Sequence, residues 1–222
     1  NEPVVSAVGV LPLHHVGGLM GWLRSALTGG EFVDGNWREI KAGSGPYPNG
    51  DARTISLVPT QLKILLERDA GTAWLRRFSR VLIGGAGLDQ SIARCARDAQ
   101  VKLVCSYGAT ETAAMVAAES KSDGTPALTV LPHASIRSDA AGLIEGRGAS
   151  VCHGYWPAEY ESSSVWHSGD WGRLLADGRI VIEGRADDLI VTGGEKVNPR
   201  EVEHLLRSAV GDDRVAVIGV PD

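Results

Sequence analysis

The chain has 222 residues, of which 43% are apolar and 22% charged, and its formal net charge at pH 7 is −5. This length and balance suit a globular protein with one large domain, or a large domain and part of a second. The negative charge, without any run of Lys or Arg, argues against a nucleic-acid-binding surface.

The cysteines and the N-terminus bear on the compartment. Cys95, Cys105 and Cys152 are an odd number without CxxC spacing, which indicates thiols in a reducing compartment rather than disulfides or a metal site. The first residues lack the order of a signal peptide, and no apolar segment approaches the roughly 20 residues of a membrane-spanning helix. We therefore expect a cytoplasmic protein without a membrane span.

The first half of the chain predicts the strand–helix–strand units of a mainly parallel sheet. An apolar run over residues 4–13 predicts a buried strand, and leucines on one face predict a helix within residues 60–71. Residues 81–83 and 101–105 predict two further strands. A helix over residues 90–100 would join them, which is the βαβ pattern.

The second half has the pattern of antiparallel, barrel-like structure. Short strands are predicted at residues 143–145 and 149–152. Asp177-Gly178 predicts the turn of a hairpin between residues 173–176 and 179–183, because this dipeptide tolerates positive φ.

The C-terminal residues predict a helix followed by one more strand. Asn198, Pro199 and Glu201 have the order of an N-cap, a first and a third helical residue, and Gly211 is a helix stop. The strand is expected over residues 215–220.

One loop carries several chemically versatile side chains. Ser106-Tyr107-Gly108-Ala109-Thr110-Glu111-Thr112 follows a predicted buried strand, and ligands of α/β sheets bind beyond the carboxyl ends of strands. The loop offers an aromatic face, a glycine, hydroxyls and one carboxylate. Mg²⁺ takes one or two carboxylates together with substrate phosphates and water. The structural alternative is a strand–helix turn in which Thr110 is the cap and Glu111 a first-turn acid.

Two glycine-rich turns are less specific. Gly84-Gly85-Ala86-Gly87 follows a predicted strand, but it lacks the G-x-G-x-x-G spacing and the later acidic residue of a dinucleotide site. A nicotinamide dehydrogenase is therefore disfavoured, and a plain turn stays open. In Pro12-Leu13-His14-His15-Val16-Gly17-Gly18, the histidine pair has no metal-ligand spacing and is compatible with a structural role.

Asp170 and Arg185 flank the predicted hairpin, the first in His167-Ser168-Gly169-Asp170. A hairpin brings its two ends together, so these residues are predicted to be neighbours. They could form a salt bridge that ties the hairpin. Alternatively, the carboxylate could accept hydrogen bonds from two adjacent hydroxyls, as on a ribose, with the arginine beside it.

The order of these motifs resembles the adenylate-forming superfamily of acyl-CoA synthetases, nonribosomal adenylation domains and luciferases. The likeness extends over nearly the whole chain. Six motifs carry it, in the family's order. The first three are a histidine-containing acyl-pocket motif at Pro12–Gly18, an adenine-side glycine loop at Gly84–Ala86 and a YGxTE signature at Tyr107–Glu111. The other three are a TGD motif with serine for threonine at Ser168–Asp170, a GRxDD hinge at Gly184–Asp188, and the glycine loop and helix after it at Gly193–Glu203.

The resemblance implies a role for each site residue. The nucleotide contacts come from the loops at residues 84–87 and 106–112 and from the ends of the hairpin: Gly84, Gly85, Ala86, Tyr107, Gly108, Thr110, Asp170 and Arg185. The catalytic residues are Thr110, Glu111 and Lys196, with Glu111 as the Mg²⁺ ligand. The acyl pocket takes His15, Gly17 and Ser106. The path of coenzyme A is bordered by Gly193 and Gly194, and the hinge is Asp187.

The resemblance also implies an architecture. The fold class is α/β: a large N-terminal domain over residues 1–186, with mainly parallel sheets and a small antiparallel barrel part, and the start of a small, mobile α+β domain over residues 187–222. The family's phosphate loop and its C-terminal adenylation lysine have no counterpart in the sequence, and residue 1 is not methionine. We therefore expect either a fragment or a chain whose ends extend further.

The implied activity is that of an ATP-dependent acid–CoA ligase. Its partners are small molecules, namely a carboxylic acid, ATP and coenzyme A, with Mg²⁺ as cofactor, and a homodimer is an option. Ser56–Leu62 and Gly193–Pro199 are most similar to o-succinylbenzoate–CoA ligase of menaquinone biosynthesis. A fatty- or aryl-acyl-CoA ligase, a carrier-protein adenylation domain and a catalytically incomplete nucleotide-binding fragment remain alternatives.

Overall fold

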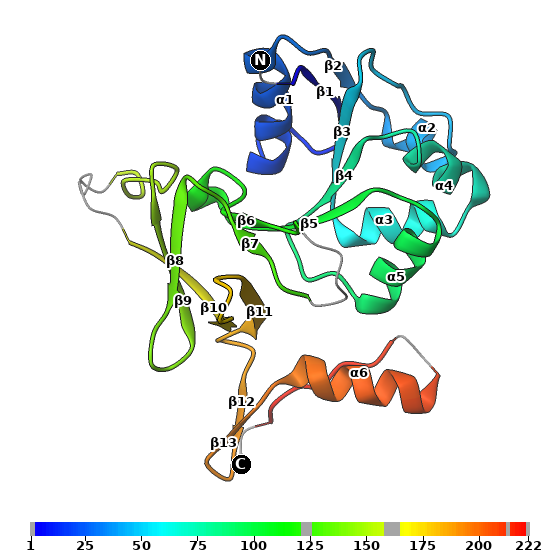
Figure 1. The fold of residues 1–222 in the computed structure, drawn as a ribbon. Coiled ribbons are helices and arrows are strands. Elements are labelled where there is room, and N and C mark those ends of the chain that lie inside the picture. Colours follow the sequence, from blue (N-terminus) through cyan, green and yellow to red (C-terminus); the bar gives the residue numbers. More distant parts are fainter. Residues whose placement is uncertain (1–2, 121–125, 158–164, 212–213, 221–222) are drawn as a thin grey trace.

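The computed structural model describes residues 3–120, 126–157, 165–211 and 214–220. Its largest element is a seven-stranded sheet with the order β2-β1-β3-β4-β5-β6-β7 (Figure 1). The first five of these strands are parallel, and β6 and β7 add an antiparallel edge. The strands are β1 Val5–Gly9, β2 Phe32–Asp34, β3 Ala52–Leu57, β4 Arg80–Ile83, β5 Leu103–Tyr107, β6 Ala117–Ala118 and β7 Thr129–Val130.

Helices cover both faces of this sheet, as the predicted α/β class requires (Figure 1). One face carries α1, and the other carries the remaining four: α1 Val16–Thr28, α2 Trp37–Lys41, α3 Pro59–Leu66, α4 Asp69–Leu75 and α5 Gln90–Asp98. The main core lies on the four-helix side, where Phe78 and Leu62 are fully buried against Ile55. This asymmetry places the deeper apolar layer beneath β3, β4 and β5.

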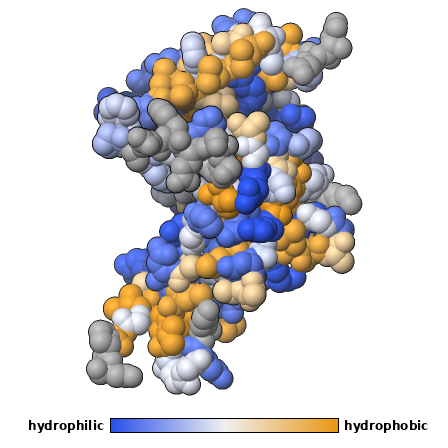
Figure 2. Space-filling view, turned by 90° about the vertical axis from the view of Figure 1, so that its left-hand side faces the viewer, coloured by the Kyte–Doolittle hydropathy of each residue, from blue (hydrophilic) through white to orange (hydrophobic). Residues whose placement is uncertain are grey.

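The outer side of α1 is apolar. Leu19, Trp22 and Leu27 on this helix are all exposed, and apolar surface is visible over the upper part of the view in Figure 2. At Gly18 the helix packs closely on the turn that precedes it. A Cβ at Gly18 would lie 2.3 Å from the Pro12 carbonyl oxygen, so a glycine is required there.

The predicted antiparallel part is a four-stranded sheet with the order β11-β10-β9-β8. A second core, which includes Trp166, Ile144 and Ile180, joins it to the edge of the large sheet. All its strand pairs are antiparallel: β8 Ala134–Ser138, β9 Leu143–Gly148, β10 Trp166–Leu174 and β11 Ile180–Arg185. The predicted hairpin is confirmed, and Gly178 in its turn has φ of +81°.

The C-terminal part holds a small hairpin and one helix. The strands β12 Ile190–Thr192 and β13 Glu195–Val197 turn at two glycines, and α6 spans Pro199–Val210. The predicted cap is confirmed, because the Asn198 side chain accepts a hydrogen bond from the Arg200 backbone N–H at 3.1 Å. The helix ends at Gly211, whose φ is +72°. Among the described residues, no helix combines the length and apolar character needed to cross a bilayer.

Several predicted boundaries were wrong. The helix expected within residues 60–71 is α3, which ends at Leu66, and a second helix, α4, which contains Gly71, was not predicted. The strand expected at residues 101–105 is shifted by two residues, so Tyr107 is its last residue. Residues 149–152 form a turn after β9, in which the Val151 N–H donates to the Gly148 carbonyl. Residues 215–220 form no strand, since no described segment pairs with them.

Candidate functional site

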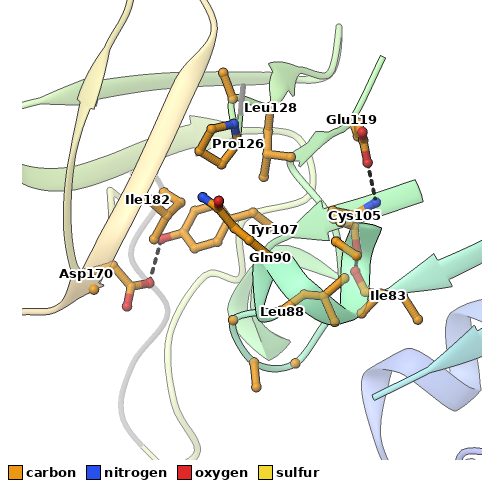
Figure 3. Close-up of a pocket in the computed structure, with 18 of the residues that line it drawn as sticks. Ile83, Leu88, Gln90, Cys105, Tyr107, Glu119, Pro126, Leu128, Asp170 and Ile182 are labelled. Carbon is orange, nitrogen blue, oxygen red and sulfur yellow. Dashed lines mark hydrogen bonds between the residues drawn. The ribbon is translucent and has the colours of Figure 1, made fainter. Parts of the chain in front are cut away.

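A cavity of about 840 Å³ lies between β5, α5, residues 126–128 and the β10–β11 hairpin (Figure 3). Part of its wall is apolar, with Leu88, Leu128 and Ile182 around the ring of Tyr107. Several charged side chains also line it, Arg94, Arg97 and Glu119 among them. A cavity of this size that combines apolar walls with polar groups is typical of a small-molecule site. It opens at the carboxyl end of β5, where ligands of α/β sheets bind.

The polar end of the cavity joins β5 to the hairpin. Asp170 pairs with Arg185 in the register of β10 and β11, as the sequence predicted. The Arg185 Nη1 donates to Asp170 Oδ1 at 3.4 Å, and the Tyr107 hydroxyl donates to Asp170 Oδ2 at 2.6 Å. The carboxylate is therefore held from two sides, by an aromatic hydroxyl and by a guanidinium.

Neighbouring groups fix this arrangement. The Asp170 backbone N–H donates to Ser168 Oγ at 3.0 Å, and that hydroxyl donates to the Ile144 carbonyl at 2.9 Å. Arg185 also donates to the Ser168 carbonyl and to Asp187. A serine in place of threonine thus keeps the hydroxyl that orients the strand. A Cβ at Gly169 would lie 2.9 Å from Arg185 Nη2, so a glycine leaves room for the guanidinium.

Protonation follows from these contacts. Burial, and then the hydrogen bond to Asp170, raise the pKa of Tyr107 above its ordinary value. The hydrogen bond to Asp187, and then the charge of Asp170, raise the pKa of Arg185. At neutral pH the site therefore contains a neutral phenol that can donate and a permanent cation.

The glycine loop after β4 forms a second wall. Gly85, with φ of +80°, and Ala86 line the cavity. Gly84 is not part of the lining, but a Cβ there would lie 2.8 Å from the Ser106 Oγ. A Cβ at Gly108 would lie 1.7 Å from the Ala114 carbonyl oxygen. Gly108 is thus needed for close packing of the chain on itself.

Thr110 and Glu111 lie in a short 3-10 turn and do not line this cavity. Thr112, rather than Thr110, makes the capping hydrogen bond, because its Oγ1 accepts from the Ala109 N–H at 2.9 Å. The Glu111 Oε1 accepts from the Tyr155 hydroxyl at 2.6 Å. Among the described residues no three His, Cys, Asp or Glu side chains cluster as a metal site. Glu111 brings one carboxylate, and a carboxylate together with phosphates and water is a ligand set that Mg²⁺ accepts.

The remaining predicted residues lie apart from the cavity. Exposed His15 is the N-cap residue of α1 and packs on His14, with Gly17 in the first turn. Gly193 and Gly194 have φ of +58° and +82° and have no neighbouring atom within 4 Å of a Cβ. Asp187 is exposed and bonds to Arg185, and the Lys196 side chain falls outside the part that the structure describes. The cavity thus unites seven of the predicted residues: Gly85, Ala86, Ser106, Tyr107, Gly108, Asp170 and Arg185.

Two residues near the site were not predicted. Tyr155 follows a glycine and precedes Trp156-Pro157, and this aromatic pair in a loop was the signal that could have drawn notice. Arg200, on α6, lines the cavity and lies close enough to Gly87 that a Cβ there would meet its Nη1 at 2.8 Å. Nothing in the spacing of Arg200 indicates this contact, which depends on how α6 lies against the glycine loop.

Cys105 lines the cavity and is expected to be unreactive. Burial, and then the charge of Glu119, raise the pKa of this thiol from 9.0 to about 12. The thiolate fraction at pH 8 falls about a thousandfold for a shift of this size. Iodoacetamide should therefore label the exposed Cys95 much faster than Cys105 in the folded protein. Peptide mass spectrometry in buffer and in guanidinium would test this, and equal rates in buffer would contradict it.

Comparisons with known proteins show which family this chain resembles. A model of the family described as AMP-binding enzyme matches residues 3–156. The 2-succinylbenzoate–CoA ligase of Listeria monocytogenes is 30% identical over 223 residues, which are 96% of this chain and 47% of that protein. The indoleacetate–CoA ligase of Aromatoleum aromaticum is 29% identical over 230 residues, 94% of this chain and 45% of that protein. The chain spans about half the length of these curated relatives.

Solved structures agree in fold. A variant of E. coli MenE with bound OSB-AMS has a TM-score of 0.72 and 28% identity, covering 91% of this chain and 44% of that one. The o-succinylbenzoate CoA synthetase of Bacillus subtilis, in complex with its acyl-adenylate intermediate OSB-AMP, has a TM-score of 0.79 at 23% identity, covering 100% and 49%. The resemblance seen in the sequence is confirmed, and the chain belongs to the family of AMP-binding enzymes.

Proposed function

We propose that this chain provides the nucleotide site of an ATP-dependent acid–CoA ligase. The observation that carries the proposal is the contact of Tyr107 and Arg185 with Asp170 at one end of a cavity large enough for adenosine. An aromatic face can stack on a purine base. A carboxylate held in place can accept from both hydroxyls of a ribose, and the neighbouring glycine loop leaves the base unobstructed.

The proposed reaction has two steps. A carboxylate oxygen of the acid attacks the α-phosphorus of ATP, pyrophosphate leaves, and an acyl-adenylate forms. The thiol sulfur of coenzyme A then attacks the acyl carbon, AMP leaves, and a thioester forms. Negative charge grows on phosphate oxygens in the first step, so fixed donors and cations stabilise its transition state. Mg²⁺ held by Glu111 would supply such a cation, and the Thr110 hydroxyl would supply a donor.

The other proposed roles rest on the family motifs. Ser106, His15 and Gly17 would face the acyl group. Gly193 and Gly194, which have open space around them, would border the path of coenzyme A. Asp187 would be the hinge between residues 1–186 and 187–222, and Lys196 would act near the phosphates. Because one site would serve two successive steps, the part of the protein beyond this hinge would have to move between them.

We propose o-succinylbenzoate as the acid and menaquinone biosynthesis in the cytoplasm as the setting. Support comes from the Listeria ligase and from the likeness to the E. coli MenE variant. The indoleacetate ligase supports an aryl-acid alternative at nearly the same identity.

The deciding experiment is an ATP–pyrophosphate exchange assay with a panel of acids, followed by thioester formation with coenzyme A. It uses both the 222-residue chain and the whole product of its gene. Exchange that depends on o-succinylbenzoate and a thioester with free coenzyme A are expected from the whole product. Exchange with aryl or fatty acids only would change the substrate, and transfer only to a carrier protein would indicate an adenylation domain. AMP binding without exchange by the whole product would indicate nucleotide binding alone.

Replacing Glu111 with glutamine should raise the Mg²⁺ concentration needed for half-maximal exchange about tenfold, because an amide oxygen is a poorer Mg²⁺ ligand than a carboxylate. Tyr155→Phe removes one hydrogen bond to Glu111 and should raise this Mg²⁺ concentration about threefold. Binding of Mn²⁺ in the presence of AMP, followed by electron paramagnetic resonance, provides a readout besides activity. Unchanged metal dependence in Glu111→Gln would contradict the assigned ligand.

A further inference from the structure

The number of acceptor sites on Asp170 suggests a role for the Tyr107 hydroxyl. An ionised carboxylate has about four lone-pair positions. In the structure, Oδ2 accepts from Tyr107 at 2.6 Å and Oδ1 from Arg185 at 3.4 Å. One position on each oxygen is thus used, and one on each remains. Two adjacent sugar hydroxyls require two acceptors.

Asp170 and the ring of Tyr107 are both restrained by their surroundings. The Asp170 side chain is only 15% exposed. The Tyr107 ring lies against Trp166, with ring centroids 5.7 Å apart and an interplanar angle of 43°. Figure 3 shows the Tyr107 hydroxyl directed toward Asp170 across the polar end of the cavity. The hydrogen bond therefore fixes both the tilt of the Tyr107 ring and the direction of the Asp170 carboxylate.

We infer that the Tyr107 hydroxyl is a positioning group that aims Asp170 at the 2′- and 3′-hydroxyls of the nucleotide and so selects ribose over 2′-deoxyribose. The inference rests on the proposed nucleotide site and adds a role to its aromatic residue. The ring of Tyr107 stacks on the base, and its hydroxyl acts on the sugar through Asp170. A preorganised acceptor loses less conformational freedom on binding than a mobile one.

The opposite relation would be competition, in which the tyrosine hydroxyl occupies the place of a sugar hydroxyl. Removal of the hydroxyl would change the affinity for AMP in opposite directions under positioning and under competition. Positioning predicts weaker binding of AMP by Tyr107→Phe, and competition predicts tighter binding. Since Oδ2 can accept two hydrogen bonds, no displacement of Tyr107 is required.

The test measures dissociation constants of AMP and 2′-deoxy-AMP by titration calorimetry for the 222-residue chain and for Tyr107→Phe. We expect AMP to bind about tenfold more weakly to Tyr107→Phe, with 2′-deoxy-AMP affected less, so that the preference for ribose falls. A double substitution with Asp170→Asn should show that the two effects are not additive. Tyr47→Phe, which removes a hydroxyl bonded to the Arg77 carbonyl away from this cavity, is the matched control and should leave both constants unchanged.

The outcomes separate this inference from the proposed function. Absence of AMP binding by the unchanged chain would overturn both. AMP binding with the same ribose preference in Tyr107→Phe would overturn the positioning role alone. Tighter AMP binding by that variant would replace positioning by competition. Thermal unfolding of each variant checks that the fold is retained, and the ratio of the two constants is insensitive to a uniform loss of folded protein.

Discussion

Asp170→Asn is expected to weaken AMP binding about 100-fold. The substitution removes the charge that pairs with Arg185 and reduces the acceptor capacity toward the sugar. Hydrogen bonds to a charged group contribute about 1.5–3 kcal/mol each, and losing roughly 2.7 kcal/mol corresponds to a hundredfold change in dissociation constant. Titration calorimetry with AMP measures the effect directly. The fold should persist, since asparagine has nearly the same volume and can still accept from Tyr107.

Asp177→Asn is the matched control for this variant. Asp177 lies in the turn at the other end of the same hairpin, where it pairs with Arg179. Asparagine followed by Gly178 is a favourable turn pair, so the hairpin should form as before. Unchanged AMP binding is expected from this control. If Asp170→Asn bound AMP as well as the unchanged chain does, the salt-bridge interpretation of Asp170 and Arg185 would replace the sugar-binding one.

Gly108→Ala is expected to lower the free energy of unfolding by about 3 kcal/mol and to disorganise the loop after β5. Its Cβ would lie 1.7 Å from the Ala114 carbonyl oxygen and 2.8 Å from the Met115 Cα. Both are backbone atoms, which cannot move aside as the end of a flexible side chain can. Overpacking of this kind usually costs about 1–3 kcal/mol and occasionally more. Guanidinium unfolding followed by tryptophan fluorescence gives the value.

Gly21→Ala is the corresponding control. Gly21 lies within α1, and a Cβ there would meet nothing within 4 Å. Alanine is the better helix former by about 1 kcal/mol, so this variant should unfold at equal or higher denaturant concentration. Equal destabilisation by both substitutions would show that contact with residues 114–115 is not what requires Gly108.

Local chemistry made much of the fold predictable. The Asp177-Gly178 turn fixed the hairpin, and the hairpin in turn brought Asp170 to Arg185, a contact confirmed in the register of β10 and β11. Asn198 and Gly211 marked the ends of α6, because capping depends only on adjacent backbone groups. These features need no knowledge of distant parts of the chain.

Features that depend on long-range pairing were missed. The apolar segment over residues 215–220 has the composition of a strand, yet strands form only where another strand completes their hydrogen bonds. The last residue of β5 could not be placed from its apolar pattern, because pairing of Ser106 and Tyr107 with β6 extends that strand. The contact of Tyr155 with Glu111 joins residues 44 apart, and no spacing rule predicts it.

The sequence by itself determined the class of fold, the family and seven of the residues that line the cavity. It did so because turn, cap and loop chemistry is local and because the motifs retain their order. Only the tertiary structure decided that Tyr107 donates to Asp170, that Arg200 reaches the glycine loop and that Gly108 packs against residue 114. Those contacts depend on how β5, the hairpin and α6 pack together, and packing is a property of the whole chain.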